Sequence, residues 1–343
     1  MNPAPAWGTA LDPPPRPLWL PSPTMADDRP VLTLAHSADP DDAFMWWPIT
    51  GKVNPDGTPR AKGRTAVIDT GRFRFRAIPG DIEAFNRRAA EVGDYDITAL
   101  SARAYADVRD RYAITSCGSS FGEGYGPKLV CRDADAYLRD AGSFMLTDLT
   151  IAVPGRRTTA FMTLCLLLGK SVVGDGSRFI DVPFDRVIPT VRDGGADAGL
   201  VIHEGQVTFK DAGLRQLTDL GEWWQKTTNL PLPLGINAVR RDLDERFGEG
   251  STAEVVRTLR SAIAHALANR QEGLEYAVPF AAANAKASGT KPPTIEGIDA
   301  YVAMYVTDLT VGLDKTGRDA IRRILRDGAA AGLCPDVGGI DIV

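Results

Sequence analysis

A histidine at the end of an apolar stretch is the first residue whose type and position suit chemistry. Residues 199–202 read as a buried strand that runs directly into His203, Glu204 and Gly205. Histidine takes up and releases protons near neutral pH, and α/β folds place their chemistry at the carboxyl ends of strands. His203 is therefore a candidate general base, and the competing interpretation is a histidine with a structural role.

Two adjacent threonines occupy a second position that suits ligand binding. Thr158 and Thr159 lie between an apolar strand over residues 149–153 and a run with helical character over residues 160–168. The first amides of a helix lack intrahelical partners, and together with the helix dipole they attract carboxylates. The threonine hydroxyls either add donors to such an anion site or simply cap the helix.

Serines at two further strand ends are candidates for the same site. Ser119 and Ser120 open a glycine-dense turn, SSFGEGYGP, whose backbone can approach a ligand closely, although ordinary loops share this composition. The turn matches neither the phosphate-binding loop nor the dinucleotide fingerprint. Ser101 follows the strand-like residues 95–100 and has the same two interpretations.

Several common catalytic and metal-binding patterns are absent from the sequence. There is no GxSxG elbow, which argues against a Ser-His-Asp hydrolase. The four cysteines are far apart, so we expect buried thiols in a reducing compartment rather than a zinc site or disulfides. Asp39, Asp41 and Asp42 resemble a cation site, but the helix start beside them favours capping. We therefore expect no metal.

The composition is that of an ordinary globular protein. Of the 343 residues, 44% are hydrophobic and 24% are charged, with a net charge of −5 and a pI of about 5.4. A nucleic-acid-binding protein would need a basic face, so we expect no such partner. No run approaches the roughly 18 apolar residues of a membrane span. The sequence does not reveal the oligomeric state.

The first residues of the chain differ from the rest. Residues 1–29 are rich in proline and poor in residues that can form a core, which predicts a disordered segment. The segment has neither the basic start nor the apolar centre of a signal peptide, so we expect a cytoplasmic protein. Met25 opens a more compact sequence and is a second candidate for the translation start.

Strands alternate with helices along most of the chain, which predicts parallel α/β sheets. From residue 252 the pattern is almost entirely helical. We expect this tail to return to the first block, so that residues 30–146 and 245–343 form one lobe and residues 147–244 the other. Clefts between lobes are favoured ligand sites. Residues 51–71 read as an insertion.

The chain resembles the MqnA/MqnD family of menaquinone biosynthesis by the futalosine route, from about residue 31 to residue 338. The resemblance rests on six segments in one order: HSADPDDAFMWW, GEGYGPKLV, TIAVPGRRTTAFMTL, GLVIHEGQVTF, DLGEWWQKTTNLPLPLG and YVTDLTVGLDKTGRDAI. The stretches IHEG and DLGEWW…LPLPLG look most like the naphthoate synthase branch and unlike the chorismate dehydratase branch.

The resemblance implies a type II periplasmic-binding-protein fold, with two α/β lobes around a ligand cleft. It implies a cofactor-free carbon–carbon lyase that converts cyclic dehypoxanthinyl futalosine to 1,4-dihydroxy-6-naphthoate, with His203 as general base. The expected partner is a small aromatic carboxylate. The family's ligand contacts would fall on Ser101, Ser119, Ser120, Thr158 or Thr159, and the amide of Ala160.

Two departures from the family bear on the substrate. The opening motif is HSADPDDAF where the family has something closer to SPCPNDTF, and residues 51–71 look inserted. Two alternatives therefore stand beside the lyase: a non-catalytic binding protein for a small aromatic or carboxylic acid, and a sibling lyase or dehydratase.

A neutral His203 acting as base predicts activity that falls on the acid side with an apparent pKa of about 6 to 7.

Overall fold

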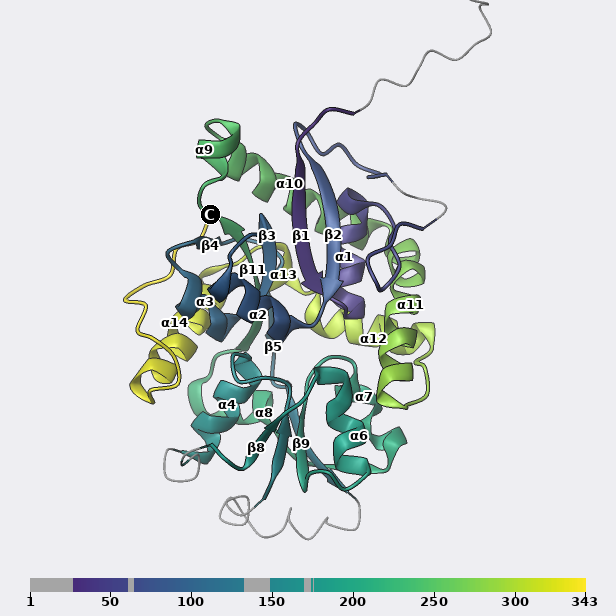
Figure 1. Ribbon diagram of the computed structural model, residues 1–343, viewed down its shortest axis with the longest axis vertical. Helices are drawn as coiled ribbons and strands as arrows, with labels where there is room; N and C mark the ends of the chain where they lie inside the picture. The colour runs from purple at the N-terminus through teal and green to yellow at the C-terminus, as the bar shows by residue number, and fades with distance from the viewer. Residues whose placement is uncertain (1–26, 61–64, 133–148, 170–173, 175) are drawn as a thin grey trace, which may run out of the picture.

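The computed structural model of the chain describes residues 27–60, 65–132, 149–169, 174 and 176–343. It contains two β-sheets with helices around them, and these form the two lobes seen above and below one another in Figure 1. The expected two-lobed α/β architecture is confirmed. Residues 1–26 of the proline-rich segment and residues 61–64 of the expected insertion lie outside the described residues.

The first sheet joins strands from two separate parts of the chain. Its members are β1 (Val31–Ser37), β2 (Arg74–Gly80), β3 (Ile97–Ser101), β4 (Tyr112–Ile114), β5 (Ser120–Gly122) and β11 (Leu232–Arg240). The order is β2-β1-β3-β11-β4, and β5 also pairs with β11. β1 is parallel to β2 and β3, so all three end at the same edge of the sheet, whereas β11 is antiparallel to its partners.

The second sheet lies in the lower lobe of Figure 1. Its five strands are β6 (Lys128–Arg132), β7 (Ile151–Val153), β8 (Phe179–Asp181), β9 (Ala198–Val201) and β10 (Leu214–Asp219), in the order β10-β6-β9-β7-β8. β7 is parallel to β8 and β9, so the segments that follow β7 and β9 leave the sheet at one edge. These segments carry Thr158 and His203.

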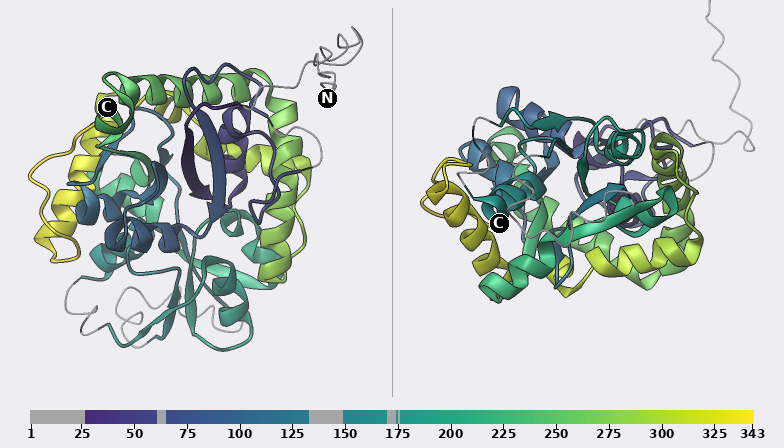
Figure 2. Two further views of the ribbon diagram at one scale, coloured as in Figure 1. Left: turned by 45° about the horizontal axis from the view of Figure 1, so that its top comes forward. Right: turned by 90° about the horizontal axis from the view of Figure 1, so that it is seen from below.

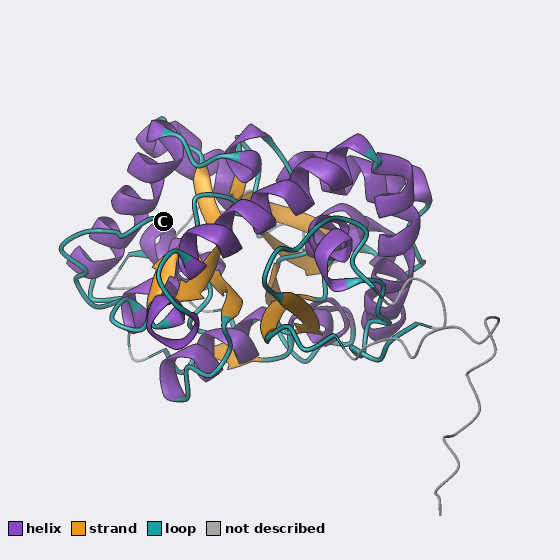
Figure 3. Ribbon diagram, turned by 90° about the horizontal axis from the view of Figure 1, so that it is seen from above, coloured by secondary structure: helices purple, strands orange, loops and turns teal. Residues whose placement is uncertain are grey.

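Helices enclose both sheets, as the view from above in Figure 3 shows. Figure 2 shows α10 over the top of the first lobe, with α11 and the yellow α14 along opposite sides. The helices of the first lobe are α1 (Pro40–Thr50), α2 (Ile82–Glu91), α3 (Tyr105–Val108), α9 (Leu243–Phe247), α10 (Ser251–Ala268), α11 (Arg270–Ser288), α12 (Ile295–Tyr305), α13 (Asp308–Val311) and α14 (Lys315–Ala330). Those of the second are α4 (Thr159–Leu168), α6 (Val187–Arg192), α7 (Gly205–Thr208) and α8 (Leu220–Thr228). Short 3-10 turns are η1 (Ala102–Ala104), η4 (Phe184–Arg186) and η5 (Phe209–Ala212).

Strand pairing divides the chain between the sheets differently from the expected lobe boundaries. Those boundaries, 146/147 and 244/245, stay a prediction about domains. β6 pairs with β9 and β10 in the second sheet, although it precedes residue 147, and β11 pairs with β3 in the first sheet, although it precedes residue 245. Hydrophobic patterns identify a strand but not its partner, so sequence alone assigns neither strand to its sheet.

The chain passes between the sheets twice, through residues 123–127 and again between α8 and β11. The first passage packs tightly against the start of α8. A Cβ atom on Gly126 would lie 3.0 Å from the Gly221 backbone, and one on Gly221 would lie 1.9 Å from the Tyr125 carbonyl oxygen. Only glycine permits this approach, which explains Gly126 in GEGYGP and Gly221 in DLGEWW.

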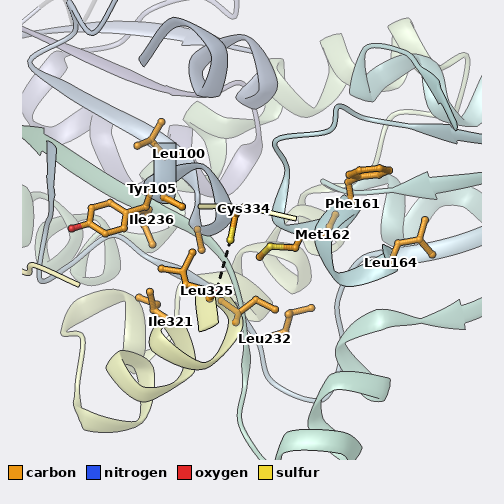
Figure 4. Close-up of a cluster of buried hydrophobic side chains, with 14 of the residues drawn as sticks. Leu100, Tyr105, Phe161, Met162, Leu164, Leu232, Ile236, Ile321, Leu325 and Cys334 are labelled. Carbon is orange, nitrogen blue, oxygen red and sulfur yellow. Dashed lines mark hydrogen bonds between the residues drawn. The ribbon is translucent and has the colours of Figure 1, made fainter. Parts of the chain in front are cut away.

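One hydrophobic core continues from the first lobe into the second (Figure 4). It joins side chains of the first sheet and α14 to side chains of α4: Leu100, Ile236, Ile321, Leu325, Phe161, Met162 and Leu164. Burial of such side chains is the main stabilising term in folding, so α4 is tied to the first lobe as well as to its own. The four cysteines are buried, as expected. None of the described helices is long and apolar enough to cross a membrane.

Candidate active site

A cavity of about 100 Å³ lies between the two lobes. The first lobe contributes the ends of β1 and β3, the start of α1, and parts of β11 and α12. The second contributes the start of α4 and the segment after β9. The polar lining residues are Ser37, Asp39, Asp41, Asp42, Ser101, Ser120, Thr158, Thr159, His203, Gln206, Asn237, Tyr301 and Tyr305.

Most of the residues predicted from the sequence meet in this cavity. Six of them line it: Ser101, Ser120, Thr158, Thr159, Ala160 and His203. Ser119 does not line it: its side chain is fully buried, and its hydroxyl has no partner among the described residues. Adjacent residues of an extended segment point to opposite faces, so only one of the two serines can face the cavity.

The start of α4 forms one end of the cavity. Thr158 is the N-cap: its Oγ1 accepts the Phe161 N–H at 3.1 Å and donates to the Gly155 carbonyl at 2.8 Å. The Thr159 hydroxyl donates to the Leu234 carbonyl in β11 at 2.8 Å. Both hydroxyl protons are therefore used within the protein. The free donors here are backbone amides, since those of the first helical residues have no intrahelical acceptor.

Two serine hydroxyls lie near this end. The Ser101 hydroxyl accepts from the Asn86 side-chain amide at 3.0 Å, and the Ser120 hydroxyl accepts from the Gly235 N–H at 3.1 Å. Each hydroxyl accepts one bond from the protein and keeps a proton that it can donate. The α4 end of the cavity is therefore rich in donors.

His203 sits in a sharp turn at the end of β9. Its backbone is left-handed, with a φ of 56°, a conformation that histidine adopts more readily than most residues. The ring folds back over Gly205, where a Cβ atom would lie 2.5 Å from His203 Cε1. The motif IHEG is thereby explained in part: the glycine makes room for the histidine ring.

Both ring nitrogens of His203 have backbone partners. The Gly205 N–H donates to Nδ1 at 2.7 Å, so Nδ1 carries the lone pair and Nε2 carries the proton, 3.3 Å from the Phe184 carbonyl. Burial lowers the pKa of His203 to about 4. The apparent pKa of about 6 to 7 expected from the sequence is therefore wrong for this ring, because the sequence does not reveal its burial.

Three aspartates at the start of α1 form an acidic wall of the cavity. Asp39 is the N-cap, but its side chain makes no capping bond, so the expected capping role is wrong for that side chain. Asp42 accepts the Ser37 N–H at 2.6 Å. Burial raises the pKa of Asp42 to about 8 and that of Asp41 to about 6. Oδ1 of Asp39 and Oδ1 of Asp41 have no partner among the described residues.

Five other polar lining residues were not predicted from the sequence: Ser37, Gln206, Asn237, Tyr301 and Tyr305. Asn237 donates from Nδ2 to the Gly118 carbonyl at 2.7 Å, and its Oδ1 is unpartnered within the described chain. The Tyr305 hydroxyl donates to Gln206 Oε1 at 2.9 Å and so joins α12 to α7 across the cleft. Tyr301 lies one helical turn before Tyr305. The i,i+4 spacing of the tyrosines was the available signal, because it puts both on one helix face.

The described residues contain no group of three or more histidine, cysteine, aspartate or glutamate side chains that could hold a metal ion. In the acidic wall, the raised pKa of Asp42, about 8, means that this carboxyl group favours its protonated form near neutral pH. Protonated carboxyls donate as well as accept hydrogen bonds, so this wall suits a ligand that bears hydroxyl groups.

The fold defines a class of two-lobed binding-protein-like structures. The alkanesulfonate-binding protein SsuA from Xanthomonas axonopodis pv. citri is similar, with a TM-score of 0.59, 12% identity, and coverage of 91% of this chain and 98% of that chain. A protein of Archaeoglobus fulgidus is more similar in sequence, with a TM-score of 0.70, 36% identity, and coverage of 88% and 98%.

The chain belongs to the menaquinone biosynthesis family, whose model matches residues 32–330. It is 38% identical over 304 residues to the 1,4-dihydroxy-6-naphthoate synthase of Thermus thermophilus, covering 88% of this chain and 96% of that protein. It is 32% identical over 309 residues to the synthase of the same name from Streptomyces coelicolor, covering 90% and 96%. The family resemblance noted in the sequence is confirmed, and these relatives support an enzyme.

Proposed function

We propose that the chain is a cofactor-independent carbon–carbon lyase that converts cyclic dehypoxanthinyl futalosine to 1,4-dihydroxy-6-naphthoate in menaquinone biosynthesis. The observation that carries the proposal is the interlobe cavity in which the start of α4 and His203 meet. Similarity to two named naphthoate synthases over about nine-tenths of the chain supports the same product.

The carboxylate of the substrate binds at the start of α4. The amides of Thr159 and Ala160 are its donors, helped by the hydroxyl protons of Ser101 and Ser120. Charge-assisted bonds from backbone amides are the strong class of hydrogen bond, and the helix dipole adds to them. The two threonine hydroxyls shape this site rather than contact the ligand, because they donate to Gly155 and Leu234.

The reacting ring lies between this carboxylate end and the acidic wall. Fragmentation of a cyclic skeleton into an aromatic product is driven by aromatisation, so positioned proton transfers suffice and no cofactor is part of the proposal. His203 is the general base. Its Nδ1 lone pair is held by the Gly205 N–H in this conformation, so the ring must change a hydrogen-bond partner before it accepts a proton.

The lobes move apart to admit the substrate. The cavity of about 100 Å³ is smaller than the roughly 300–1,000 Å³ of most ligand pockets. This small volume supports a closed cleft, in which the Tyr305–Gln206 bond links the lobes. A closed cleft keeps water away from the reacting ring during the proton transfers.

The test is turnover of the proposed substrate. Purified protein is incubated with cyclic dehypoxanthinyl futalosine, and 1,4-dihydroxy-6-naphthoate is followed by mass spectrometry. We expect product from the wild-type chain and far less from His203→Asn. Well-folded protein that yields no product would contradict the proposal.

A non-catalytic binding protein is the second candidate, and the likeness to the alkanesulfonate-binding protein favours it. Thermal-shift measurements with small aromatic acids separate the two. Tight binding without turnover, and affinity as the sole property changed by His203→Asn, would favour the binding protein.

A further inference from the structure

Glu204 is a buried carboxyl group beside the His203 ring that does not line the cavity. Its residue exposure is 4%, and neither carboxyl oxygen has a hydrogen-bond partner among the described residues. Oε2 lies 3.6 Å from His203 Nδ1. Burying a carboxyl group away from water destabilises a fold, so its presence here points to a role other than stability.

The surroundings of Glu204 oppose its ionised form. Asp39 and Asp41 at the start of α1 and Tyr301 on α12 face it from the other lobe, and none of them supplies a positive charge. Burial raises the pKa of Glu204 to about 8, while the Asn284 amide on α11 acts in the opposite direction. Near neutral pH the group therefore holds its proton next to a histidine that is neutral.

The described state of His203 is the wrong tautomer for a base that works through Nε2. Nδ1 holds the lone pair and Nε2 the proton. Reversing this arrangement requires an acceptor for an Nδ1–H group. The Gly205 N–H cannot accept, and the ionised carboxylate of Glu204, at 3.6 Å, is the acceptor that the geometry offers.

We propose that Glu204 is a positioning residue that sets which ring nitrogen of His203 carries the proton. When Glu204 ionises, its proton passes to Nδ1, the proton on Nε2 leaves to water, and the new Nδ1–H donates to the carboxylate. One proton is released in total, and Nε2 is left with a lone pair that can accept a proton from the substrate. The inference rests on the proposed function only for its link to turnover.

The test reads the tautomer directly by NMR. The chain has three histidines, His36, His203 and His265, so selective ¹⁵N-histidine labelling gives three ring spin systems. His36 Nδ1 lies 2.7 Å from the Ser37 carbonyl and must donate to it, so His36 is an internal reference for the Nδ1–H form. For His203 we expect the Nε2–H pattern at pH 6 and the Nδ1–H pattern above pH 8.

Matched variants separate Glu204 from its neighbours. Glu204→Gln cannot ionise, so the His203 pattern should stay constant from pH 6 to pH 9, whereas Glu204→Asp should restore a transition. Glu222→Gln, an exposed control, should behave like the wild type. A His203 tautomer transition that persists in Glu204→Gln would overturn the proposal. So would the loss of this transition in Asp41→Asn, a variant in which Glu204 is intact.

Kinetics supply the second measurement. In Glu204→Gln we expect kcat to fall about 10²-fold or more, as for a base held in the wrong tautomer, with little change in KM. In the wild type we expect kcat to rise with pH toward 8, as Glu204 ionises. This rise should be absent in Glu204→Gln. The NMR result does not need turnover, so a protein that makes no naphthoate but shows the tautomer transition would contradict the proposed function and leave this inference standing.

Discussion

The side chain of His203 can be replaced without changing the turn that holds it. Asparagine tolerates the left-handed backbone found at this position, so His203→Asn should stay folded. We expect turnover to fall on the order of 10²- to 10⁴-fold, the usual contribution of a general base. Initial rates and a thermal melt check both expectations, with His265→Asn as a control outside the cavity. Near-normal turnover would refute the assignment of His203 as base.

Buried acids give the fold an unusual pH dependence. Burial raises the pKa of Glu204 and of Asp42 to about 8, from ordinary values of 4.5 and 3.8. The folded state therefore holds more protons, and the stability from these groups is present below pH 4 and is lost as the pH rises toward 8. The lowered pKa of His203, about 4, acts only between pH 6.5 and pH 4, where its contribution is lost as the pH falls.

We therefore expect the free energy of unfolding to fall between pH 6.5 and pH 8.5. Urea denaturation at several pH values across this window measures it. Glu204→Gln should make the fall smaller, because the variant has one fewer group that binds a proton on folding. A free energy of unfolding that rises across the window would show that the buried acids ionise without penalty.

At the scale of elements, two variants at the start of α4 separate what the backbone amide and the side-chain hydroxyl contribute to ligand affinity. Thr159→Val removes the hydroxyl and keeps the amide, whereas Thr159→Pro removes both, and proline is tolerated at the first helical position. Thr158 before it is extended, with a ψ of 147°, as a residue before proline requires. We expect Thr159→Pro to bind 1,4-dihydroxy-6-naphthoate more weakly than Thr159→Val by about 1.5–3 kcal/mol.

Thr158→Val is the matched comparison for this pair. It removes the cap of α4, so the free energy of unfolding should fall by about 1 kcal/mol, with naphthoate affinity unchanged. Calorimetric titration gives the affinities, and denaturation gives the stability. Equal affinities for Thr159→Pro and Thr159→Val would place the carboxylate away from this helix start.

The sequence predicted those site features that depend on local order along the chain. An apolar strand, two threonines and an apolar helix predicted α4, its cap and the cluster at its start. The strand before IHEG similarly predicted where His203 lies. Partners from distant segments were beyond it: neither the Leu234 acceptor of Thr159 nor the Tyr305 donor to Gln206 has a local signal.

The sequence also did not predict that the aspartates of the acidic wall line the cavity. Asp39 and its neighbours follow a strand and begin a helix, a local pattern that fits capping. Their function as cavity lining depends on β9 and α12 arriving from the far half of the chain. Burial by distant elements also decides the pKa of His203. The sequence does not reveal this burial, and for that reason it predicted an apparent pKa of about 6 to 7.

At the scale of the whole molecule, Gly221 tests how the lobes are joined. It lies in the first turn of α8, where alanine would ordinarily favour the helix by about 1 kcal/mol. A Cβ atom would instead overlap the Tyr125 carbonyl, so we expect Gly221→Ala to lose about 1–3 kcal/mol of stability and to bind naphthoate more weakly. Gly312→Ala, with open space around it, is the control. A Gly221→Ala protein as stable as the control would contradict this contact.

The contact between Gly126 and the start of α8 also has a mechanical meaning. Two separate linkers would let the lobes slide, twist and bend independently. Here the first linker packs against the start of α8, the helix that leads into the second linker, and β5 next to it pairs with the start of β11, so the two linkers cannot move independently. We therefore expect relative motion to be reduced largely to a single angle. A bound ligand then favours one value of the angle between the lobes. Substitutions in the cavity change the angle that the ligand-free protein adopts, but the lobes still move about the same axis.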